Sequence, residues 1–539
     1  MNRFLSPEPI VKLEKAFSNP FRNLIATAQT CYSGKGIINE DNITEDYRKL
    51  AKSIYKAGHH TTLQHAHFQF SISNVSRQFV WSFLHSHPFY NSEQVSQRYV
   101  SVKPGNFLVP SLKGRALALY EKTIDLQMEA YSRITERLYP VVKSEYLKRF
   151  SAYDKAIKGV KGKGGRAKLL QLELPIYSSA RRLEKEVTKK SQEVARYVIP
   201  VSAFTYLYHT ISAVTLLRYY RLCRMYDTPV EQQLVVEKMV QEVLKVEPLY
   251  KLILEDPLET SEIPEYQFFQ SEESVRGYKP SKHFLREFDT RLDGRISRLI
   301  DYKHNNEAVL AQSVREVLGL PRYRLSDRKA IRLVMDPSQN RLYGETLNLS
   351  TMSKLTRALA HVTYTFSKKM SHTADSQNQR HRTTPASRPC LHRHLTEEPD
   401  FIIPELIRQD EKIEKDYRET MEKTWDAVGR IRKFSVSDEF AMYLLPNAVA
   451  VRFTESGDLF NLRHKYAMRL CYNAQEEIWR ASLDEVEQIS KVNPGIGKYL
   501  LPPCTSRDMA GVRPVCPEGE RFCGVKVWRL RLRDYKRII

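Results

Sequence analysis

The spacing of hydrophobic side chains predicts a mixture of helices and half-buried strands. Residues 45–58 have helical spacing and end at Gly58, a typical helix stop. Residues 65–73 alternate polar and apolar side chains over most of their length, which is the period of a strand with one buried face. Helical spacing also covers residues 116–146, 191–198 and 230–244.

Two segments of the chain repeat one another. The motif EVARYVIP at residues 193–200 matches EFAMYLLP at residues 439–446. Each motif follows a similar strand, HAHFQF at residues 65–70 and HVTYTF at residues 361–366, and an arginine-containing segment follows each motif. Because the order of these elements is shared at similar spacing, the sequence predicts an internal duplication.

The duplication divides the chain into four parts. The first copy is expected in residues 1–250 and the second in residues 301–490. Residues 251–300 are expected to link them, because residues 254–282 are rich in Glu, Pro and Ser with little periodicity. The strand-to-proline distance is 135 residues in the first copy and 85 in the second, so the first copy carries an insertion of 50 residues. Residues 491–539 form a cysteine-containing tail.

The chain is strongly basic. The 539 residues carry a formal net charge of +22 at pH 7, which favours an anionic partner such as nucleic acid, a membrane surface or a phosphate-bearing ligand. Part of this charge lies at residues 155–168, which form either a solvated loop or a phosphate or nucleic-acid contact. Neither a membrane span nor a secretory signal is recognisable, so we expect a cytoplasmic protein. Seven scattered cysteines favour reduced thiols.

Candidate chemistry lies downstream of the strand in each copy. In the second copy, Gln377 precedes the triplet Arg380-His381-Arg382, whose guanidinium groups suit a phosphate or an electron-rich ring. In the first copy, residues 92–100 bring an acid, a serine and an arginine within a few positions of one another. Together these three side chains could hold a phosphate and the edge of a base.

These motifs resemble the signature of flavin-dependent thymidylate synthases, which has the form R-H-R-x-x-S-x-N-E-x-S-x-R-Y. The second copy matches its beginning with residues 380–382, and the first copy matches its end with Ser96, Arg98 and Tyr99. The segment that begins at His59 is similar to the family's flavin-contacting histidine segment. Neither copy carries the whole signature.

The losses in the two copies are complementary. The first copy keeps Arg196 of the family's E-x-A-R motif, where the second copy has Met442. The second copy keeps the family's late helix, which contains Arg469. Its counterpart in the first copy is either Arg224 or Arg221.

The resemblance implies one composite site. In this family the site lies between subunits of a homotetramer, so the two copies could divide its residues, and a homodimer of this chain could mimic the tetramer. The residues expected to face the flavin are His59, Gln377, Arg380, His381 and Arg382. The residues expected to bind deoxyuridylate (dUMP) are Gln94, Ser96, Arg98, Arg196 and Arg469, of which the three arginines also polarise the uracil ring.

The implied fold is α/β (α+β), with two copies of a small antiparallel sheet flanked by helices packed as a pseudo-dimer. The implied reaction is reductive methylation of dUMP to dTMP, with FAD as cofactor and NADPH and methylenetetrahydrofolate as co-substrates. Two alternatives are a non-catalytic flavin- or nucleotide-binding relative and a flavin-dependent nucleic-acid methylase. The triplet at residues 380–382 could also be a solvated helix face, and Arg196 could complement a helix dipole.

The tail contains Cys504, Cys516 and Cys523 among Pro and Gly residues, a composition seen around metal knuckles. The C-x-x-C pair is missing, and three thiolates need a fourth ligand to hold structural zinc. A zinc site and a plain capping tail therefore both remain open.

Overall fold

The computed structural model describes most of the chain. The described residues are 3–34, 36–43, 47–158, 180–225, 227–268, 270 and 282–539. The main elements of the first copy are β1 (Ile10–Ala16), α1 (Pro20–Thr30), α2 (Tyr47–Lys56), β2 (His67–Ser76), α3 (Arg77–His85), β3 (Asn91–Gln94), α4 (Gly114–Lys158), α6 (Ala180–Ala195), β4 (Phe204–Ser212), α7 (Ala213–Arg221) and α8 (Pro229–Val246). Those that follow are α10 (Lys282–Leu292), β5 (Ser297–Tyr302), α11 (Asn306–Leu318), α12 (Asp327–Met335), β6 (Thr363–Ser371), α13 (His372–Asn378), β7 (Ala386–Ser387), α14 (Glu405–Arg408), α15 (Glu411–Arg432), α16 (Asp438–Met442), β8 (Ala450–Asp458), α17 (Leu459–Arg469), α18 (Glu476–Val492), α19 (Pro494–Gly497) and α20 (Pro503–Met509).

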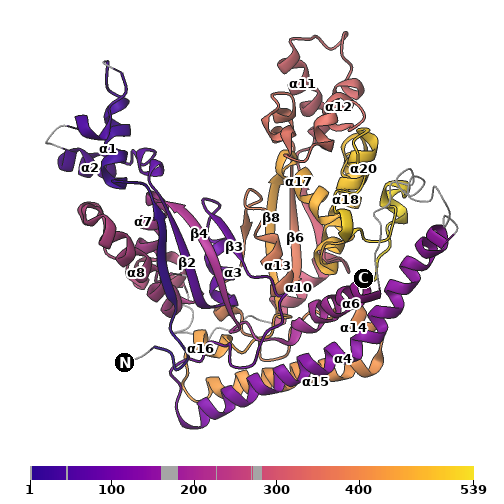
Figure 1. The fold of residues 1–539 in the computed structure, drawn as a ribbon, viewed down its shortest axis with the longest axis horizontal. Coiled ribbons are helices and arrows are strands. Elements are labelled where there is room, and N and C mark those ends of the chain that lie inside the picture. Colours follow the sequence, from indigo (N-terminus) through magenta and orange to yellow (C-terminus); the bar gives the residue numbers. More distant parts are fainter. Residues whose placement is uncertain are drawn as a thin grey trace.

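The strands form two four-stranded antiparallel sheets with the same topology. Their orders are β1-β2-β4-β3 and β5-β6-β8-β7. The two sheets lie side by side in the middle of the molecule, and the long helices α4 and α15 run together beneath both (Figure 1). This arrangement confirms the expected mixed α/β fold with two antiparallel copies.

The predicted helix at residues 45–58 and the predicted strand at residues 65–73 are both present, with shifted bounds. The helix is α2, and the strand is β2, which begins only at His67 because Thr62–His65 forms a 3-10 turn. Along β2, side chains alternate between buried and more exposed positions as the pattern predicts. The alternation is interrupted by a bulge at Asn74, whose φ of 56° is left-handed.

The repeated motifs meet at a pseudo-twofold axis. Pro200 and Pro446 form an antiparallel bridge. On either side of it, Val201 N donates to Leu445 O at 2.8 Å, and Asn447 N donates to Ile199 O at the same distance. Because each copy makes the same contact with the other, the two halves are packed as a pseudo-dimer.

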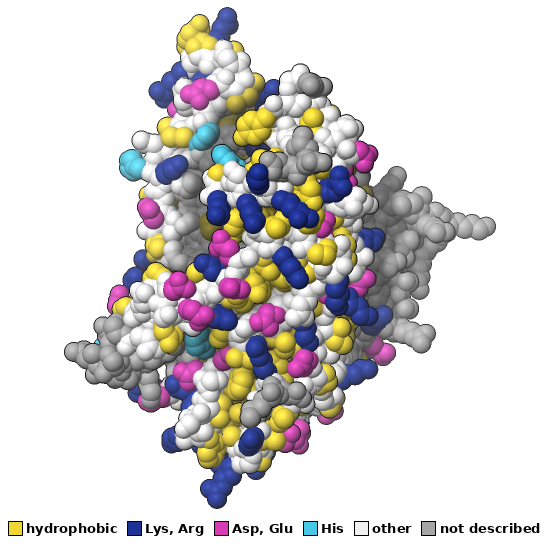
Figure 2. Space-filling view, turned by 90° about the vertical axis from the view of Figure 1, so that its left-hand side faces the viewer, with side chains coloured by type: hydrophobic (Ala, Val, Ile, Leu, Met, Phe, Trp, Pro, Cys, Tyr) yellow, Lys and Arg dark blue, Asp and Glu magenta, His cyan; other side chains and the backbone are white. Residues whose placement is uncertain are grey.

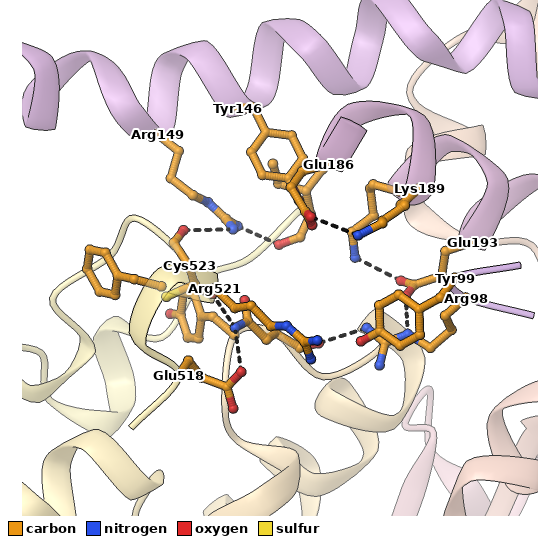
Figure 3. A pocket seen from close by; sticks show the side chains of 15 residues that line it. Arg98, Tyr99, Tyr146, Arg149, Glu186, Lys189, Glu193, Glu518, Arg521 and Cys523 are labelled. Carbon is orange, nitrogen blue, oxygen red and sulfur yellow. Dashed lines mark hydrogen bonds and ion pairs between the residues drawn. The ribbon is translucent and has the colours of Figure 1, made fainter. Parts of the chain in front are cut away.

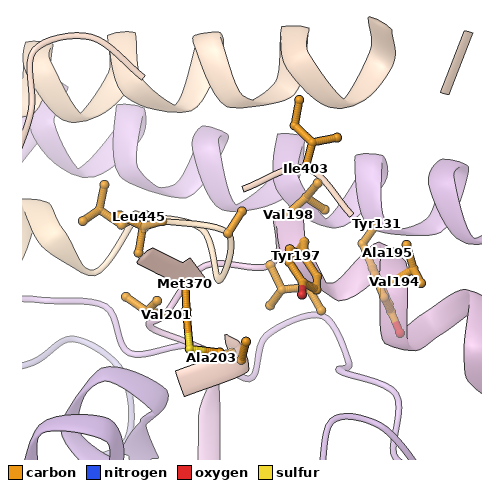
Figure 4. Packing of buried hydrophobic residues seen from close by; sticks show 14 of the residues in the cluster. Tyr131, Val194, Ala195, Tyr197, Val198, Val201, Ala203, Met370, Ile403 and Leu445 are labelled. Atoms are coloured by element: carbon orange, nitrogen blue, oxygen red, sulfur yellow. The ribbon is translucent and has the colours of Figure 1, made fainter. Parts of the chain in front are cut away.

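A hydrophobic core shared by both copies surrounds this axis. Tyr197 and Val198 of the first copy and Met370 and Leu445 of the second belong to one buried cluster (Figure 4). Each copy also has a separate core between its own sheet and helices. Since the shared core is apolar and continuous, the two copies form one folding unit rather than two tethered domains.

The insertion of the first copy lengthens its central helix. Helix α4 has 45 residues, whereas the corresponding α15 has 22. Part of the basic segment at residues 155–168 lies outside the described residues. The second copy also begins earlier than the expected linker end at residue 300, because α10 packs on β6 and β5 starts at Ser297.

Charged side chains cover the surface in a mixed pattern. On the face shown in Figure 2, a short row of basic side chains lies in the upper half, and basic and acidic side chains are interspersed below it. Among the described residues, no helix is long and apolar enough to cross a membrane.

Candidate functional site

Each sheet presents a short helix that starts at a capped serine. Ser76 begins α3 and Ser371 begins α13, and each hydroxyl accepts a hydrogen bond from the backbone amide three residues further on. A buried glutamate holds each serine: Glu231 accepts from the Ser76 amide and hydroxyl at 2.7 and 2.6 Å, and Glu477 accepts from those of Ser371, both at 2.6 Å. Equivalent positions in α3 and α13 can therefore be compared directly.

In the second copy, Arg469 orders the end of α13. Its Nε donates to His381 Nε2 at 2.8 Å, and its Nη2 donates to Gln377 O at 2.6 Å. Burial, followed by the neighbouring Arg469 charge, lowers the pKa of His381 well below its usual value. The imidazole is therefore neutral at physiological pH, with Nε2 as acceptor and the proton on Nδ1.

The two arginines of the triplet reach across to the first copy. Arg380 pairs with Glu93 at 3.2 Å, and both side chains are more than half exposed. Arg382 Nη2 donates to Asn91 Oδ1 at 3.2 Å, and its guanidinium lies over the ring of Tyr90. A groove between the copies runs along these residues and β3.

In the first copy, Arg98 links the loop after β3 to both copies. Its Nε pairs with Glu193 of α6, and its Nη2 donates to Asn473 O of the second copy at 2.8 Å. The backbone amide of Arg98 also donates to Ser96 Oγ at 3.3 Å. Arg98 and Ser96 therefore lie next to the segment that carries Arg469.

Arg196 is a buried cation with unsatisfied donors. It is 4% exposed, and its Nε and Nη2 find no hydrogen-bond partner in the described part of the chain. Burial and the neighbouring Arg196 lower the pKa of Arg77 to about 9. Burial and the charges of Arg98 and Arg380 likewise lower the pKa of Arg469 to about 9. Glu193, which pairs with Arg98, offsets part of this repulsion at Arg196, and a bound anion would relieve more of it.

Arg77 is a site residue that the sequence analysis missed. Its Nη2 donates to Val95 O at 2.9 Å, and its Nη1 lies 3.5 Å from Gln94 Oε1, so it holds the loop that carries Ser96. A basic residue in the first turn of a helix opposes the helix dipole. The sequence analysis predicted no helix at this position, so this mismatch becomes visible only once α3 is known to begin at Arg77.

We call the residues gathered here the composite site: Arg77, Gln94, Ser96, Arg98, Arg196, Gln377, Arg380, His381, Arg382 and Arg469. His59 is not among them. It is exposed, it follows α2, and its amide donates to Ile54 O of that helix. Helix α2 lies at the end of the first copy that is far from α13 and α17 (Figure 1). One chain therefore does not bring His59 to the other predicted flavin contacts.

A pocket beside Arg98 is built by the insertion and the tail. Tyr146 and Arg149 enter from α4, Lys189 from α6, and Arg521 from the tail (Figure 3). Lys189 and Arg521 both lie over the ring of Tyr99, the residue next to Arg98. The insertion of the first copy and the cysteine-containing tail, which have no counterpart in the other copy, thus meet at one edge of the composite site.

The expected counterpart of Arg469 needs revision. Along the chain, Arg469 lies as many residues after the helix cap Asp458 as Cys223 lies after the cap Ser212. It also lies as many residues before the buried Glu477 as Cys223 lies before Glu231. The structure therefore pairs Arg469 with the buried Cys223. Arg224 and Arg221 form ion pairs with Glu259 and Glu255 instead.

The cysteines are all free thiols. Cys504, Cys516 and Cys523 lie in the described tail, and burial raises the pKa of each thiol. Throughout the described ranges, no group of three or more His, Cys, Asp and Glu side chains is placed to hold a metal ion.

The family model for thymidylate synthase complementing protein matches residues 12–249 and 298–495, one region for each copy and together well over half of the chain. The chain belongs to this family. Both expectations, the family and its tandem arrangement, are confirmed.

Individual relatives of the thymidylate synthase complementing family match part of the chain. The flavin-dependent thymidylate synthase of Clostridium tetani is 25% identical over 243 residues, which cover 44% of this chain and 83% of that protein. Those of Pyrococcus abyssi and Saccharolobus solfataricus are 30% and 32% identical over 25% and 27% of this chain, and the matches span 57% and 56% of their own length. The crystal structure of the UMP/dUMP methylase PolB from Streptomyces cacaoi bound with 5-Br dUMP aligns at 16% identity with a TM-score of 0.30, covering 49% of this chain and 96% of that one.

The donor set of this family member fits a flavin and a nucleotide phosphate. Arg380 and Arg382 line the groove between the copies. Near them, the buried Gln377 Nε2 has no hydrogen-bond partner among the residues described. Guanidinium and amide donors of this kind suit the phosphates and ring carbonyls of a flavin. The deeper arginines, Arg196 and Arg469, suit a dianionic phosphate.

Proposed function

We propose that the chain is an FAD-dependent thymidylate synthase that converts dUMP to dTMP with methylenetetrahydrofolate and NADPH. The observation that carries the proposal is the buried Arg196, whose Nε and Nη2 lack partners in the described structure. The charges that act on it include the carboxylate of Glu193 and the guanidinium groups of Arg98 and Arg77. Family membership supplies the class of reaction, and the arginine cluster supplies a place for the substrate's phosphate.

Each part of the composite site has a separate role in this proposal. Arg98 and Arg196 hold the phosphate of dUMP, with Ser96 and Gln94 beside it. Arg469 polarises the uracil ring, and its hydrogen bond fixes the neutral His381 in one orientation. Bound FAD would supply the hydride chemistry.

The protein groups bind, orient and polarise rather than form covalent bonds. Arg77 holds the loop that contains Gln94 and Ser96, so its loss should disturb both positions together. Arg380 and Arg382 keep the second copy against β3 and line the flavin groove. Charge-assisted hydrogen bonds of this kind contribute roughly 1.5–3 kcal/mol each to binding.

The first test is the absorbance spectrum of the purified protein, followed by anaerobic turnover of dUMP with methylenetetrahydrofolate and NADPH. We expect a bound-flavin spectrum and the formation of dTMP. Bound flavin without dTMP would favour the non-catalytic relative, and absence of flavin would contradict the proposal. Arg196→Met is the matched variant, because it gives the first copy the residue that the second copy has at this position.

A second chain would complete the flavin site in this proposal. His59 is exposed, and the preceding helix α2 is remote from α13 (Figure 1), so a homodimer that mimics the family's tetramer could bring His59 to the flavin of its partner. Light scattering during size-exclusion chromatography should give twice the chain mass. A mixture of His59→Ala and Arg380→Ala chains should restore activity at one of the two sites, whereas a monomer would contradict this assembly.

Retention on RNA or DNA tests the alternative of a nucleic-acid methylase. That alternative draws support from the net charge of +22, although acidic side chains are interspersed among the basic ones on the face in Figure 2. Binding that weakens steeply with salt and methylation of a polynucleotide in place of dUMP would favour it.

A further inference from the structure

The cysteine-containing tail folds back onto the chain just beyond Arg469. Asn473 Nδ2 donates to Arg521 O at 2.6 Å and lies 3.4 Å from Glu518 Oε2. Asn473 also lines the pocket at which Glu518, Arg521 and Cys523 of the tail meet (Figure 3). The tail is therefore in direct contact with the segment that follows α17.

This contact brings together four cysteines, which we call the cysteine cluster. Cys504 lies in the first turn of α20, and Cys516 and Cys523 follow it in the tail. Cys471 comes from outside the tail, two residues after Arg469. Cys504 and Cys516 belong to the shared core, and Cys523 packs against it. The fold thus supplies, in Cys471, the fourth thiol that the sequence of the tail lacks.

Electrostatic interactions within the cluster show that the four thiols are neighbours. Burial is the largest influence on each thiol and raises its pKa. The charge of Cys523 raises the pKa of Cys471, Cys504 and Cys516 further. Cys504 acts in the same way on Cys471, and Cys516 on Cys504. As thiolates the four groups would repel one another, and a divalent cation between them would relieve that repulsion.

The backbone around three of these cysteines also suits a bound thiolate. Although burial raises the pKa of each thiol, a backbone hydrogen bond from the residue two positions further on lowers it, which favours the thiolate. The pairs are Cys471 with Asn473, Cys516 with Glu518, and Cys523 with Val525. As a thiol, Cys523 donates to Val525 O at 3.6 Å, a contact that loss of the proton would end. Gly519 and Gly524 shape the turns beside these cysteines, with left-handed φ values of 53° and 84°.

We propose that Cys471, Cys504, Cys516 and Cys523 bind a structural zinc ion as four thiolates. A closed set of four sulfur ligands is one that tetrahedral Zn²⁺ prefers. Among the residues that the structure describes, no three such side chains already form a coordination sphere, so the ion must draw the sulfurs together. Each thiol that binds gives up its proton to solvent, and no group is oxidised or reduced.

The ion would act as a positioning group for the composite site. It would fasten the tail to the segment between α17 and α18, close to Arg469. In that segment, Asn473 O accepts from Arg98 Nη2 at 2.8 Å. The proposal rests on the cysteine cluster alone and does not depend on which reaction the composite site catalyses.

Zinc analysis of the full chain, purified without chelator, tests the proposal. We expect one zinc ion per chain in the parent protein. Cys471→Ser and Cys516→Ser should each weaken zinc binding about 100-fold or more, measured by competition with a chromophoric chelator, because even changes beside a metal ligand cost roughly 10–100-fold. Cys31→Ser is the matched control, since Cys31 is an exposed free thiol outside the cluster, and it should retain the metal.

Cobalt substitution gives a measurement that does not need the variants to fold. The parent chain loaded with Co²⁺ should show the visible absorption of a tetrahedral site with four thiolate ligands. A parent protein that carries no zinc and takes none up, iron in place of zinc, or zinc binding that Cys471→Ser leaves unchanged would each overturn the proposal. Zinc that depends on Cys471 in a protein that makes no dTMP would support the metal site while contradicting the synthase.

Discussion

The composite site and its counterpart across the pseudo-twofold axis share one backbone frame and differ in the side chains that it presents. This counterpart, which we call the second pocket, is lined by α3, the segment after α7 and the loop after β7. Both lie at the end of a serine-capped helix, beside the loop after a short edge strand. The side chains that matter for an anion are changed at equivalent positions. The pairs, composite site first, are Gln377 and Ser82, Arg380 and His85, and Arg196 and Met442. Duplication thus allowed one site to keep a charge that the other lost.

The difference extends into the core beneath each site. In the second copy, Lys368 pairs with Glu455 and Glu485 at 2.6 and 2.7 Å, and Lys465 pairs with Glu455 as well; all four side chains are buried. At the positions of Lys465 and Glu455 the first copy has Tyr219 and His209. A buried charge network therefore underlies the composite site, and aromatic packing underlies the second pocket.

Breaking the charge network should have the largest effect. Lys465→Met leaves Glu455 and Glu485 with Lys368 as their remaining buried lysine partner, and removal of one member of a buried pair costs about 3–5 kcal/mol. Tyr219→Phe removes one hydrogen bond to His209 at 3.3 Å and should cost about 1 kcal/mol or less. The midpoints of urea unfolding measure both changes. Equal losses would mean that the cores of the two copies do not differ in the way described.

Exchanging the residue four positions before the repeated proline should affect binding more than stability. Arg196→Met should weaken dUMP binding by roughly 10–100-fold, the equivalent of about 1.5–3 kcal/mol, and leave the melting temperature unchanged or higher. Stability is spared because the variant removes a buried guanidinium whose Nε and Nη2 are unpaired in the described residues. Calorimetric titration with dUMP gives the affinity.

Met442→Leu is the matched control for this exchange, since it changes the equivalent residue of the second copy with little change in volume. It should leave dUMP affinity unaltered. An Arg196→Met protein that binds dUMP normally but melts at a lower temperature would assign Arg196 a structural role only.

The duplication was predictable from the two repeated motifs. EVARYVIP and EFAMYLLP match because both cross the pseudo-twofold axis, where each must satisfy the same contacts with the other. The grouping of Arg98 with Arg469 was predictable only through family resemblance, because the two residues are far apart in the chain and come together only when the two copies pack. Their proximity depends on the shared core, which periodicity does not describe.

Other site residues escaped prediction for geometric reasons. The similarity of the short sequences RLCR and MRLC suggests Arg224 as the counterpart of Arg469. Counting from the helix cap and from the buried glutamate instead gives Cys223 at the position of Arg469. His59 belongs to the predicted flavin set by resemblance, but it follows α2, and that helix lies far from α13 (Figure 1). Arg77 lies outside the recognised motifs, and only its hydrogen bonds reveal its role.

The two glutamates of the repeated motif should respond to pH in opposite ways. Arg98 and Lys190 hold the pKa of Glu193 well below its usual value, although burial opposes them, whereas burial raises the pKa of Glu439 to about 8. Folded Glu439 keeps a proton that the unfolded chain releases near pH 4.5, so its contribution to stability falls as pH rises from about 4.5 to 8. Glu193 contributes stability above pH 4.5 that is lost as the solution is acidified.

Melting temperatures between pH 4 and pH 9 measure this difference. Glu439→Gln should gain on the order of 1–2 kcal/mol relative to the parent protein above pH 8, and the gain should vanish near pH 4.5. Glu193→Gln should lose stability at neutral pH and approach the parent protein on acidification. Parallel curves for the two variants would contradict the contrast between Glu193, which has cationic partners, and Glu439, which accepts hydrogen bonds from Val230 N and the Tyr443 hydroxyl.

The smallest effect is expected at Arg224, on the rim of the second pocket. Its ion pair with Glu259 is about one-third exposed on the arginine side and two-thirds on the glutamate side, so solvent screens it and the pair contributes about 1 kcal/mol or less. A double-mutant cycle with Arg224→Ala and Glu259→Gln should give that small coupling, and dUMP affinity should not change. Cys223, rather than Arg224, occupies the position of Arg469, so Arg224 is not placed to meet a phosphate. Weaker dUMP binding in Arg224→Ala would show that the second pocket still handles nucleotide phosphate, and the contrast between the two sites would then be one of degree.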